Sequence, residues 1–410
     1  MKWGKIVLQR GHILAGAAFV MLPLAVFASK AMTPLAIGTA VLLLGREVWA
    51  SRRFPPLPPL GGIVGLLAGG VAWGAISVAW TVDMGNTVGK TGQLLGLFSA
   101  GLVLIDAARR LEPKEKTWVK RALLAGFLLG SLVLACESLT DGLLSRWVRG
   151  LPAEAGLLFK APATVAALMV FPVVAALAGR WAWGVTGLLA ILLLPTHGTT
   201  AVAAVGIGGV VLLAARVRFR VTALVVAGWI VTSVVVAPVA PFVLSSCLHR
   251  PTCQTLLPSM VQHRLRIWQF TAERIAEKPV LGWGLDASRD MPGGREEVTL
   301  APGTKSRGAL LPLHPHNGVL QWWLELGGVG AMLGAGFLIA MIRNMPVYFA
   351  RYDDAAALAL MVAAIVIGLA SYGVFQSWWL GTEWLVVTWM LAVGRRPENT
   401  ESRSVQCIRY

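Results

Sequence analysis

Charged residues are scarce in this chain. They make up only 14% of its 410 residues, whereas hydrophobic residues make up 56% and the mean hydropathy is +0.69. A soluble protein of this length would need more polar residues to cover its surface. The composition therefore argues against a soluble globular protein and predicts an all-α, polytopic membrane protein.

Cysteine is also scarce, with four residues. Cys136 lies in an apolar run and is expected to be a small buried hydrophobic residue. Cys247 and Cys253 share one loop, so they could close a small disulfide if that loop faces an oxidising compartment. Two unpaired thiols are the alternative.

Acidic residues are few, 20 against 36 Lys and Arg, which leaves a net charge of +16. The basic residues fall in short clusters between apolar runs, as in the cytoplasmic loops of membrane proteins, so we predict a lipid bilayer and no nucleic acid as partner. No acidic metal motif or nucleotide-sugar fold is evident, and no metal or cofactor is predicted. No cleavable signal peptide is evident either, because a second apolar run directly follows the first.

Apolar runs long enough to cross a bilayer as helices occur along most of the chain. The twelve candidates are 13–29, 32–49, 60–80, 91–107, 119–138, 161–179, 181–195, 199–215, 220–244, 317–342, 354–376 and 379–394. The charge bias places both termini in the cytoplasm. The resulting division is 1–244 with nine spans, 245–316 as an external loop, 317–394 with three spans, and 395–410 as a cytoplasmic tail.

The external loop is an exception to the charge bias, because it is basic on the side where cations should be rare. Its cations are Arg250, Arg264, Arg266, Arg274, Lys278, Arg289, Arg295, Lys305 and Arg307. An anionic ligand is the reading that we favour for the group. For any single cation, contact with phospholipid headgroups is the alternative.

An apolar stripe in this loop predicts an amphipathic helix on the membrane surface or over a cavity. The stripe consists of Val261, Leu265, Trp268, Ala272 and Ile275, and the helix should end at Lys278-Pro279. Arg264 and Trp268 are four residues apart and share a face, whereas Arg266 points away from Arg264. The two arginines are therefore not expected to meet at one point.

The sharpest motif is His314-Pro315-His316-Asn317, at the mouth of a predicted span. Asn317 is a good N-cap, and a helix N-terminus favours an anion. An imidazole beside arginines should stay neutral and able to accept a proton. Zinc binding and a purely structural histidine are the competing readings, and zinc lacks a third ligand at a known spacing.

Further polar residues belong to the same side of the membrane or lie inside spans. They are Arg146, Lys160, His197 in the Thr196–Thr200 segment, Glu325 and Glu383. An ionisable group inside a span is costly and is a functional candidate by default, although either glutamate could instead pair with an arginine. The Gly282-Trp283-Gly284 motif is weak as a phosphate site and is more typical of a plain turn.

With these motifs placed, the sequence resembles the O-antigen ligase and polymerase superfamily of bacterial membrane glycosyltransferases. The resemblance covers most of the chain, and chain length favours the ligase branch. Its marks are Arg264-x-x-x-Trp268, Pro279-x-x-Gly282-x-Gly284, and His316-Asn317-x-x-Leu320-Gln321 leading into Glu325-x-Gly327. One departure is that Thr196–Thr200 lacks the arginine that this family often has between two spans, so another cation must replace it.

The resemblance implies an O-antigen ligase in the Gram-negative inner membrane. Its donor would be polysaccharide on undecaprenyl diphosphate, its acceptor lipid A-core at the periplasmic face, and its reaction metal-independent and inverting. His316 would be the base, and the phosphate-binding cations would be Arg264, Arg266, Lys160, Arg289 and Arg146. The supporting residues would be His314, Asn317, Gln321, His197, Trp268 and Glu383.

Three other readings stay open. An O-antigen polymerase and a protein O-oligosaccharyltransferase belong to the same superfamily and use the same kind of donor. A transporter or flippase for an anionic lipid is the reading from a different class. It would predict inverted repeats and several ionisable residues deep in the spans, and no clear repeat is present.

Overall fold

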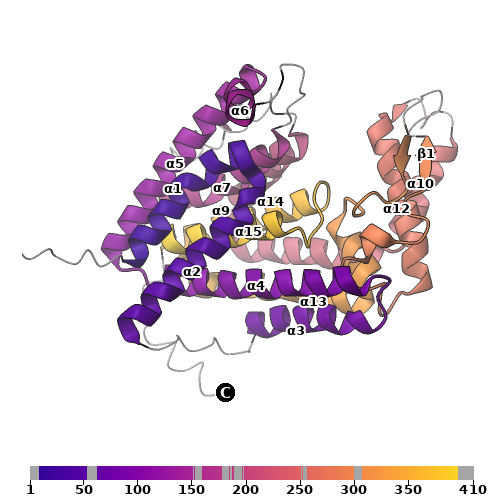
Figure 1. Cartoon of the computed structure of the whole chain (residues 1–410), viewed down its shortest axis with the longest axis horizontal. Coiled ribbons are helices and arrows are strands. Elements are labelled where there is room, and N and C mark those ends of the chain that lie inside the picture. The colour runs from indigo at the N-terminus through magenta and orange to yellow at the C-terminus, as the bar shows by residue number, and fades with distance from the viewer. Residues whose placement is uncertain are drawn as a thin grey trace, which may run out of the picture.

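The structure is a computed structural model of the whole chain (Figure 1). It describes residues 9–52, 62–150, 159–177, 198–250, 256–299 and 307–395, together with the single residues 152, 184, 187, 188, 196 and 252.

Helices dominate the described residues, which confirms the all-α, polytopic class. The helices before the loop are α1 (Arg10–Ala28), η1 (Ser29–Ala31), α2 (Met32–Ser51), α3 (Gly62–Ile76), η2 (Ser77–Ala79), α4 (Met84–Arg109), α5 (Pro113–Leu139), α6 (Leu143–Arg149), α7 (Lys160–Leu177) and α9 (Thr199–Val236). The rest are α10 (Ala240–Ser245), η4 (Ser246–His249), α12 (Ser259–Glu277), η5 (Ala287–Asp290), α13 (Gly318–Tyr348), α14 (Arg351–Gly368) and α15 (Ser377–Val393).

Seven helical stretches of the described residues are long and apolar enough to span a membrane. Every predicted span except 181–195 coincides with a helix, and most of 181–195 lies outside the described residues. The count of twelve spans and the division of the chain at 244, 316 and 394 therefore stay predictions. Two predicted spans are too long, because α14 ends at Gly368 rather than at 376 and α9 ends at Val236 rather than at 244.

Helix α9 contains two of the predicted spans, which are joined at a kink at Arg218. Gly198, just before α9, lies against Ala163 at the start of α7. Val234, near the end of α9, accepts a hydrogen bond from Trp323 at the start of α13. The helix thus begins and ends at the same end of the bundle, as two antiparallel spans require.

Contacts between helix termini define two ends of the bundle. At the end that we call the basic end, Arg10 pairs with Glu47, the Arg109 guanidinium lies over the Tyr348 ring, and Ala350 N–H donates to the Arg395 carbonyl. We call the opposite end, where His314 and His316 lie, the histidine end. The predicted cytoplasmic clusters gather at the basic end, although which side of the membrane it faces stays a prediction.

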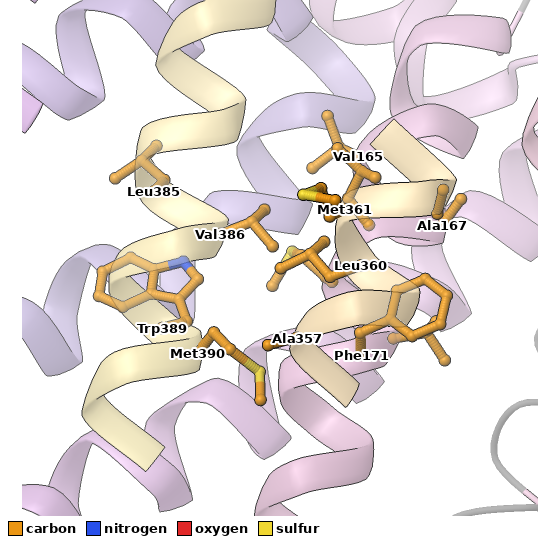
Figure 2. Close-up of a cluster of buried hydrophobic side chains, with 14 of the residues drawn as sticks. Val165, Ala167, Phe171, Ala357, Leu360, Met361, Leu385, Val386, Trp389 and Met390 are labelled. Atoms are coloured by element: carbon orange, nitrogen blue, oxygen red, sulfur yellow. The ribbon is translucent and has the colours of Figure 1, made fainter. Parts of the chain in front are cut away.

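Helix α7 is the central element of the bundle, because it is buried on all its faces from Pro162 to Ala176. A helix that is apolar all round must be enclosed by other helices. It packs against α14 and α15, where Phe171, Leu360 and Trp389 are among the buried side chains (Figure 2). The prediction that Cys136 is buried was wrong, because it lies on an outward face of α5 and is exposed.

Helices α10 and α12 and a small hairpin form a separate layer beyond the histidine end (Figure 1). The strands β1 (Glu297–Thr299) and β2 (Arg307–Ala309) pair antiparallel and were not predicted. The predicted amphipathic helix is α12, which ends at Glu277, just before Lys278 as expected. Its inner face includes Leu265, Ala272 and Ile275, but Val261 is exposed rather than buried.

Helix α13 is interrupted at Gly327, where φ is 64° and ψ is −166°. Only glycine adopts this backbone conformation readily. An interruption frees backbone carbonyl and N–H groups, and a bilayer offers them no water. The free groups near Gly327 must therefore find partners within the protein.

The turn 279–284 supplies most of those partners. Trp283 and Gly284 donate their backbone N–H groups to the carbonyls of Leu324 and Glu325, at 2.9 Å and 2.8 Å. In the other direction, Gly328 N–H donates to the Pro279 carbonyl at 2.8 Å. The Trp73 indole of α3 donates to the Leu326 carbonyl at 2.9 Å. The turn and α13 thus share backbone hydrogen bonds across the interruption.

The Pro-x-x-Gly-x-Gly motif therefore has a structural reason. Gly282 and Gly284 both have positive φ, and a Cβ on Gly282 would lie 2.5 Å from the Glu325 carbonyl oxygen. A Cβ on Gly327 would lie 2.1 Å from the Val280 carbonyl oxygen. The motif is more than a plain turn, because its glycines let two backbones come into contact.

Replacing Gly327 by Ala should destabilise the protein strongly. The substitution combines a disfavoured backbone conformation with a steric overlap against Val280, and we expect a loss of about 3 kcal/mol or more. The measurement is the melting temperature of the detergent-solubilised protein, followed by tryptophan fluorescence.

The matched control is Gly38→Ala, on an exposed face of α2 with open space around its Cβ position. This variant should melt at or slightly above the wild-type temperature, because alanine is the better helix former. Equal melting of Gly327→Ala and Gly38→Ala would contradict the role given to the interruption.

Candidate functional site

The His314-Pro315-His316 segment is a sharp turn that leads into α13. His316 has a φ of 54°, in the left-handed region that non-glycine residues rarely adopt. Asn317 caps α13 as predicted, and its side chain accepts from the N–H groups of Val319 and Leu320. From the loop side, the Trp268 indole N–H donates to the Pro315 carbonyl at 3.0 Å. The strained turn is therefore held from both sides.

Two hydrogen bonds determine which ring nitrogen of each histidine carries the proton. His316 Nδ1 lies 3.1 Å from the Ser371 carbonyl oxygen, which can only accept, so Nδ1 carries the hydrogen and Nε2 has a free lone pair. His316 backbone N–H donates to His314 Nδ1 at 3.1 Å, so in the neutral ring the His314 proton is on Nε2. The two rings meet edge to face, with centroids 4.4 Å apart.

Burial and nearby positive charge keep both imidazoles neutral. Burial, followed by His316, Arg289 and Arg264, lowers the pKa of His314 from 6.5 to about 3. The pKa of His316 is also lowered, mainly by burial and further by Arg264 and His263, although its bond to Ser371 opposes the shift. A neutral His316 with a free Nε2 lone pair can accept a proton.

The two loop arginines separate as predicted. Arg264 is half-buried, and burial lowers the pKa of its guanidinium. No hydrogen bond or ion pair of Arg264 is present within the part of the chain that the structure describes. Arg266 instead donates to the Thr299 carbonyl on β1. Arg264 is therefore the α12 cation that lies beside the histidines with free hydrogen-bond donors.

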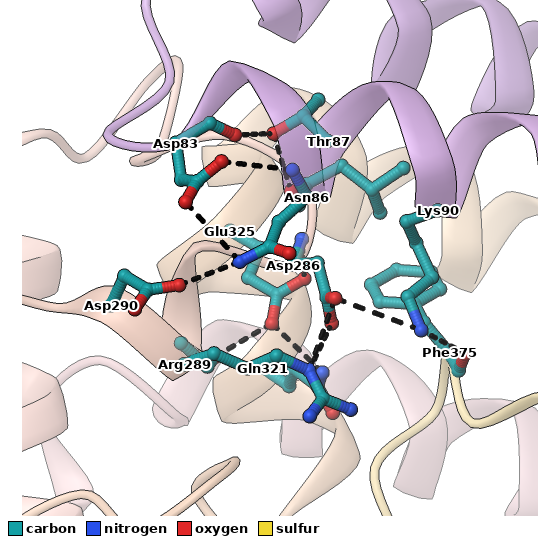
Figure 3. Close-up of polar contacts among 12 residues, drawn as sticks. Asp83, Asn86, Thr87, Lys90, Asp286, Arg289, Asp290, Gln321, Glu325 and Phe375 are labelled. Atoms are coloured by element: carbon teal, nitrogen blue, oxygen red, sulfur yellow. Dashed lines mark hydrogen bonds and ion pairs between the residues drawn. The ribbon is translucent and has the colours of Figure 1, made fainter.

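A buried carboxyl group organises the polar residues beneath the histidines (Figure 3). Glu325 is fully buried in α13, and three donors converge on it: Asp286 N–H at 2.7 Å, Ser288 O–H at 2.6 Å and Gln321 Nε2 at 2.8 Å. None of these partners is an arginine, although an arginine was one expected partner. Glu325 instead holds the segment after the 279–284 turn against α13.

In the segment after the 279–284 turn, the Asp286 carboxylate contacts two cations. Arg289 donates to the Asp286 carboxylate at 3.1 Å and 3.2 Å, and Lys90 Nζ lies 3.7 Å from the same carboxylate (Figure 3). Lys90 is almost fully buried on α4 and also donates to the Phe375 carbonyl at 3.4 Å. A second layer of contacts, from Asn86 to Asp290, joins α4 to η5.

Arg289 was predicted from the sequence, whereas Lys90 was missed. Lys90 lies one residue before the predicted span 91–107 and so resembled an ordinary flanking residue. A usable signal was present, because Lys90 is the only Lys or Arg between Arg53 and Arg109. Burying a single cation in so long an apolar stretch costs free energy, which makes Lys90 a functional candidate.

An apolar cavity of about 520 Å³ runs along the helices between the two ends. Leu285, Gly318 and Phe375 line it beside the polar cluster, and Arg109 and Tyr348 line it at the basic end. Most of its wall is aliphatic or aromatic and comes from α3, α4, α13, α14 and α15. Glu383, another predicted site residue, faces this cavity from α15.

The other predicted site residues lie on α6 and α7 or outside the residues that the structure describes. Lys160 begins α7 and is exposed, one turn before Thr164, whose hydroxyl is 3.3 Å from the Tyr372 hydroxyl. Arg146 lies on α6, which Glu137 of α5 caps through two backbone N–H groups. His197, Cys253 and the side chain of Cys247 lie outside the described residues. Within the described ranges, no three His, Cys, Asp or Glu side chains are grouped to hold a metal.

Comparison with known proteins gives a consistent result. Residues 184–335 match the family model described as O-antigen ligase. That range contains α12, both histidines, Glu325 and the interruption at Gly327.

Three proteins of Rickettsia, each with a name that describes a candidate polysaccharide ligase, are similar to this chain. The one from Rickettsia conorii is 27% identical over 349 residues, which is 78% of each chain. Those from Rickettsia felis and Rickettsia typhi are 34% and 35% identical over 132 residues, 32% of each chain. The fold, the arrangement of the site and these matches agree, and the chain is similar to O-antigen ligase-like membrane proteins.

Proposed function

We propose that this protein is an O-antigen ligase. It transfers polysaccharide from undecaprenyl diphosphate to lipid A-core at the periplasmic face of the inner membrane, with inversion at the anomeric carbon and without a metal. The observation that carries the proposal is the position of His316. Its Nε2 is free, it lies two residues before Gly318 in the wall of the apolar cavity, and Arg264 is close enough to lower its pKa.

The cavity supports a lipid-linked donor. An isoprenoid chain is apolar, so it would gain stability by lying against the aliphatic and aromatic wall along α3, α4 and α13. Its diphosphate would then emerge at the histidine end, beside Lys90 and Arg289. Arg264, which has no acidic partner among the described residues, would complete the group of cations from the loop side.

The chemistry needs one base and fixed positive charge. His316 Nε2 takes the proton from an acceptor hydroxyl while that oxygen forms a bond to the anomeric carbon. The bond from that carbon to the diphosphate oxygen breaks, and its electron pair leaves with undecaprenyl diphosphate. Lys90, Arg289 and Arg264 stabilise the negative charge that develops on this leaving group. We assign Lys160, Arg146 and Arg266 to the phosphates of the acceptor.

A direct test uses purified protein in nanodiscs with lipid-linked polysaccharide and lipid A-core. Core capped with polymer supports the ligase. In a deletion strain, free core together with lipid-linked polymer should accumulate. Polymer elongation without capped core would instead identify a polymerase, and an unchanged lipopolysaccharide pattern in that strain would overturn the proposal.

Replacing His316 by Asn should slow catalysis strongly without unfolding the site. Asparagine tolerates the left-handed backbone at this position, so it removes the base and preserves the turn. We expect the rate to fall about 10²- to 10⁴-fold, the usual contribution of a positioned base. The rate is measured as capped core formed per unit time, and normal product from His316→Asn would exclude it as the base.

On the acidic side, the pH of half-maximal kcat/KM should lie below 6.5, the ordinary pKa of histidine. The pKa of His316 is lowered, so its imidazole stays neutral at that pH and becomes protonated only in more acidic solution. We therefore expect the acidic limb of kcat/KM below pH 6.5. In Arg264→Gln the limb should move to higher pH, because Arg264 is one cause of the lowered pKa. A wild-type limb centred above 6.5 would contradict this assignment.

Removing a cation at the end of the cavity should weaken donor use. For Lys90→Gln and Arg264→Gln we expect KM for the donor to rise about 10- to 100-fold, since each loses a hydrogen bond to a charged group. Arg307→Gln is the matched control, because Arg307 is exposed on β2 and its guanidinium is 4.0 Å from Glu297. An equal effect of all three substitutions would indicate only a general loss of positive charge.

A further inference from the structure

We propose that Gln321 is a positioning residue that determines which nitrogen of His316 carries the proton. Its buried side chain ties α13 to the segment 369–376, which we call the Ser371 turn, and that turn holds His316 through the Ser371 carbonyl. This inference rests on the proposed role of His316 as the base.

Both ends of the Gln321 side chain are occupied. Gln321 is 3% exposed, its Oε1 accepts from Val374 N–H at 2.9 Å, and its Nε2 donates to Glu325 at 2.8 Å. The orientation of the amide follows from its partners. A backbone N–H can only donate, so the oxygen must face Val374 and the NH₂ group must face Glu325. The amide therefore has one arrangement that satisfies both contacts.

Glu325 cannot turn away from Gln321 without a cost. Its two carboxyl oxygens also accept from Ser288 O–H and Asp286 N–H. Moving it would leave buried donors without partners, which is unfavourable for each one. The position of Gln321 is thus fixed from below by the same network that holds Asp286 and Arg289.

The Ser371 turn lies directly on Gln321 and His314. A Cβ on Gly373 would be 3.1 Å from Gln321 Oε1 and 3.2 Å from the His314 ring. Ser371 N–H donates to the Ile367 carbonyl in the last turn of α14, and within the Ser371 turn Gln376 N–H donates to the Gly373 carbonyl. The bond from Val374 to Gln321 thus fixes a compact turn, and the Ser371 carbonyl moves with it.

That carbonyl controls the chemistry of His316. While Ser371 accepts from Nδ1–H, the lone pair is on Nε2 and can take a proton. If the turn shifts, the proton can move to Nε2, and the ring then presents a donor where the reaction needs an acceptor. Gln321 would act on the rate through this choice without contacting the substrate.

The first test is Gln321→Ala in the full-length protein. We expect kcat to fall about 10²-fold, as for a small displacement of a catalytic group, with KM for the donor within about twofold of wild type. Asn344→Ala is the matched control. It removes a side-chain amide from the same helix, where Asn344 donates to the Ala340 carbonyl near the basic end, and should keep the wild-type rate.

A second measurement reports the proton position itself. In protein labelled with ¹⁵N-histidine, the His316 signals can be assigned by their loss in His316→Asn. Wild type should show a protonated Nδ1 and a bare Nε2, and Gln321→Ala should show a mixture of both forms. An unchanged His316 spectrum in a folded Gln321→Ala protein would overturn the inference.

Exchanging the side chains of Gln321 and Glu325 distinguishes the loss of their contact from general unfolding of the protein. In Gln321→Glu, the new carboxyl faces Glu325, with Asp286, Lys90, Arg289, His314 and His316 as the other titratable groups nearby. Two carboxyl groups can share one proton in acid but repel once both ionise. We expect this variant to lose activity with rising pH, and Gln321→Glu/Glu325→Gln to lack that loss. Equal pH profiles for the single and double variants would contradict the pairing.

The two levels of the proposal can fail separately. If wild type caps no core but Gln321→Ala still changes the His316 spectrum, the ligase assignment fails and the positioning role stands. If wild type caps core and the spectrum of Gln321→Ala is unchanged, the positioning role fails and the ligase assignment stands.

Discussion

The interruption of α13 at Gly327 is the constraint on which the site depends. A helix inside a bilayer can be broken only where protein replaces its lost backbone hydrogen bonds. Here the replacement comes from the 279–284 turn and from Trp73, so that turn must enter the bundle at one defined place. That entry places Leu285 in the wall of the apolar cavity, with Asp286 and its partner Arg289 directly after it in the chain. The geometry of the site is thus a consequence of backbone hydrogen bonding.

Burial then gives the polar groups their properties. The two histidines are kept neutral because water is scarce around them and cations are near. Lys90 and Arg289 share one carboxylate, and Arg264 has no acidic partner among the described residues, so positive charge is left over. An unsatisfied cation in a poorly solvated place is costly unless an anion binds there. The same arrangement therefore favours an anionic group and preserves a base beside it.

Local sequence patterns predicted most of the helices and the cap of α13. They did not predict contacts between segments that are distant in the sequence. Hydropathy and apolar spacing predicted most of the helices, α12 among them, and the Asn317 cap follows from local chemistry. The boundary predicted between 215 and 220 coincides with the kink of α9 at Arg218, where basic residues cluster. Lys90 resembled a residue that flanks a span, and its ion pair with Asp286, almost two hundred positions away, could not be predicted from the sequence. The contact between His316 and the Ser371 carbonyl could not be predicted either, because every residue has a backbone carbonyl and the residue type does not show which one accepts.

The glycine motif shows most clearly how sequence and structure complement each other. A short Gly-x-Gly motif permits a phosphate cradle or an ordinary turn, and its spacing alone does not choose between them. In the structure, the Gly282 backbone lies so close to that of Glu325 that even a methyl group does not fit between them. Close approach of two backbones fills the place that a phosphate would need. Under the proposed function, the anion is then bound by side chains, those of Lys90, Arg289 and Arg264.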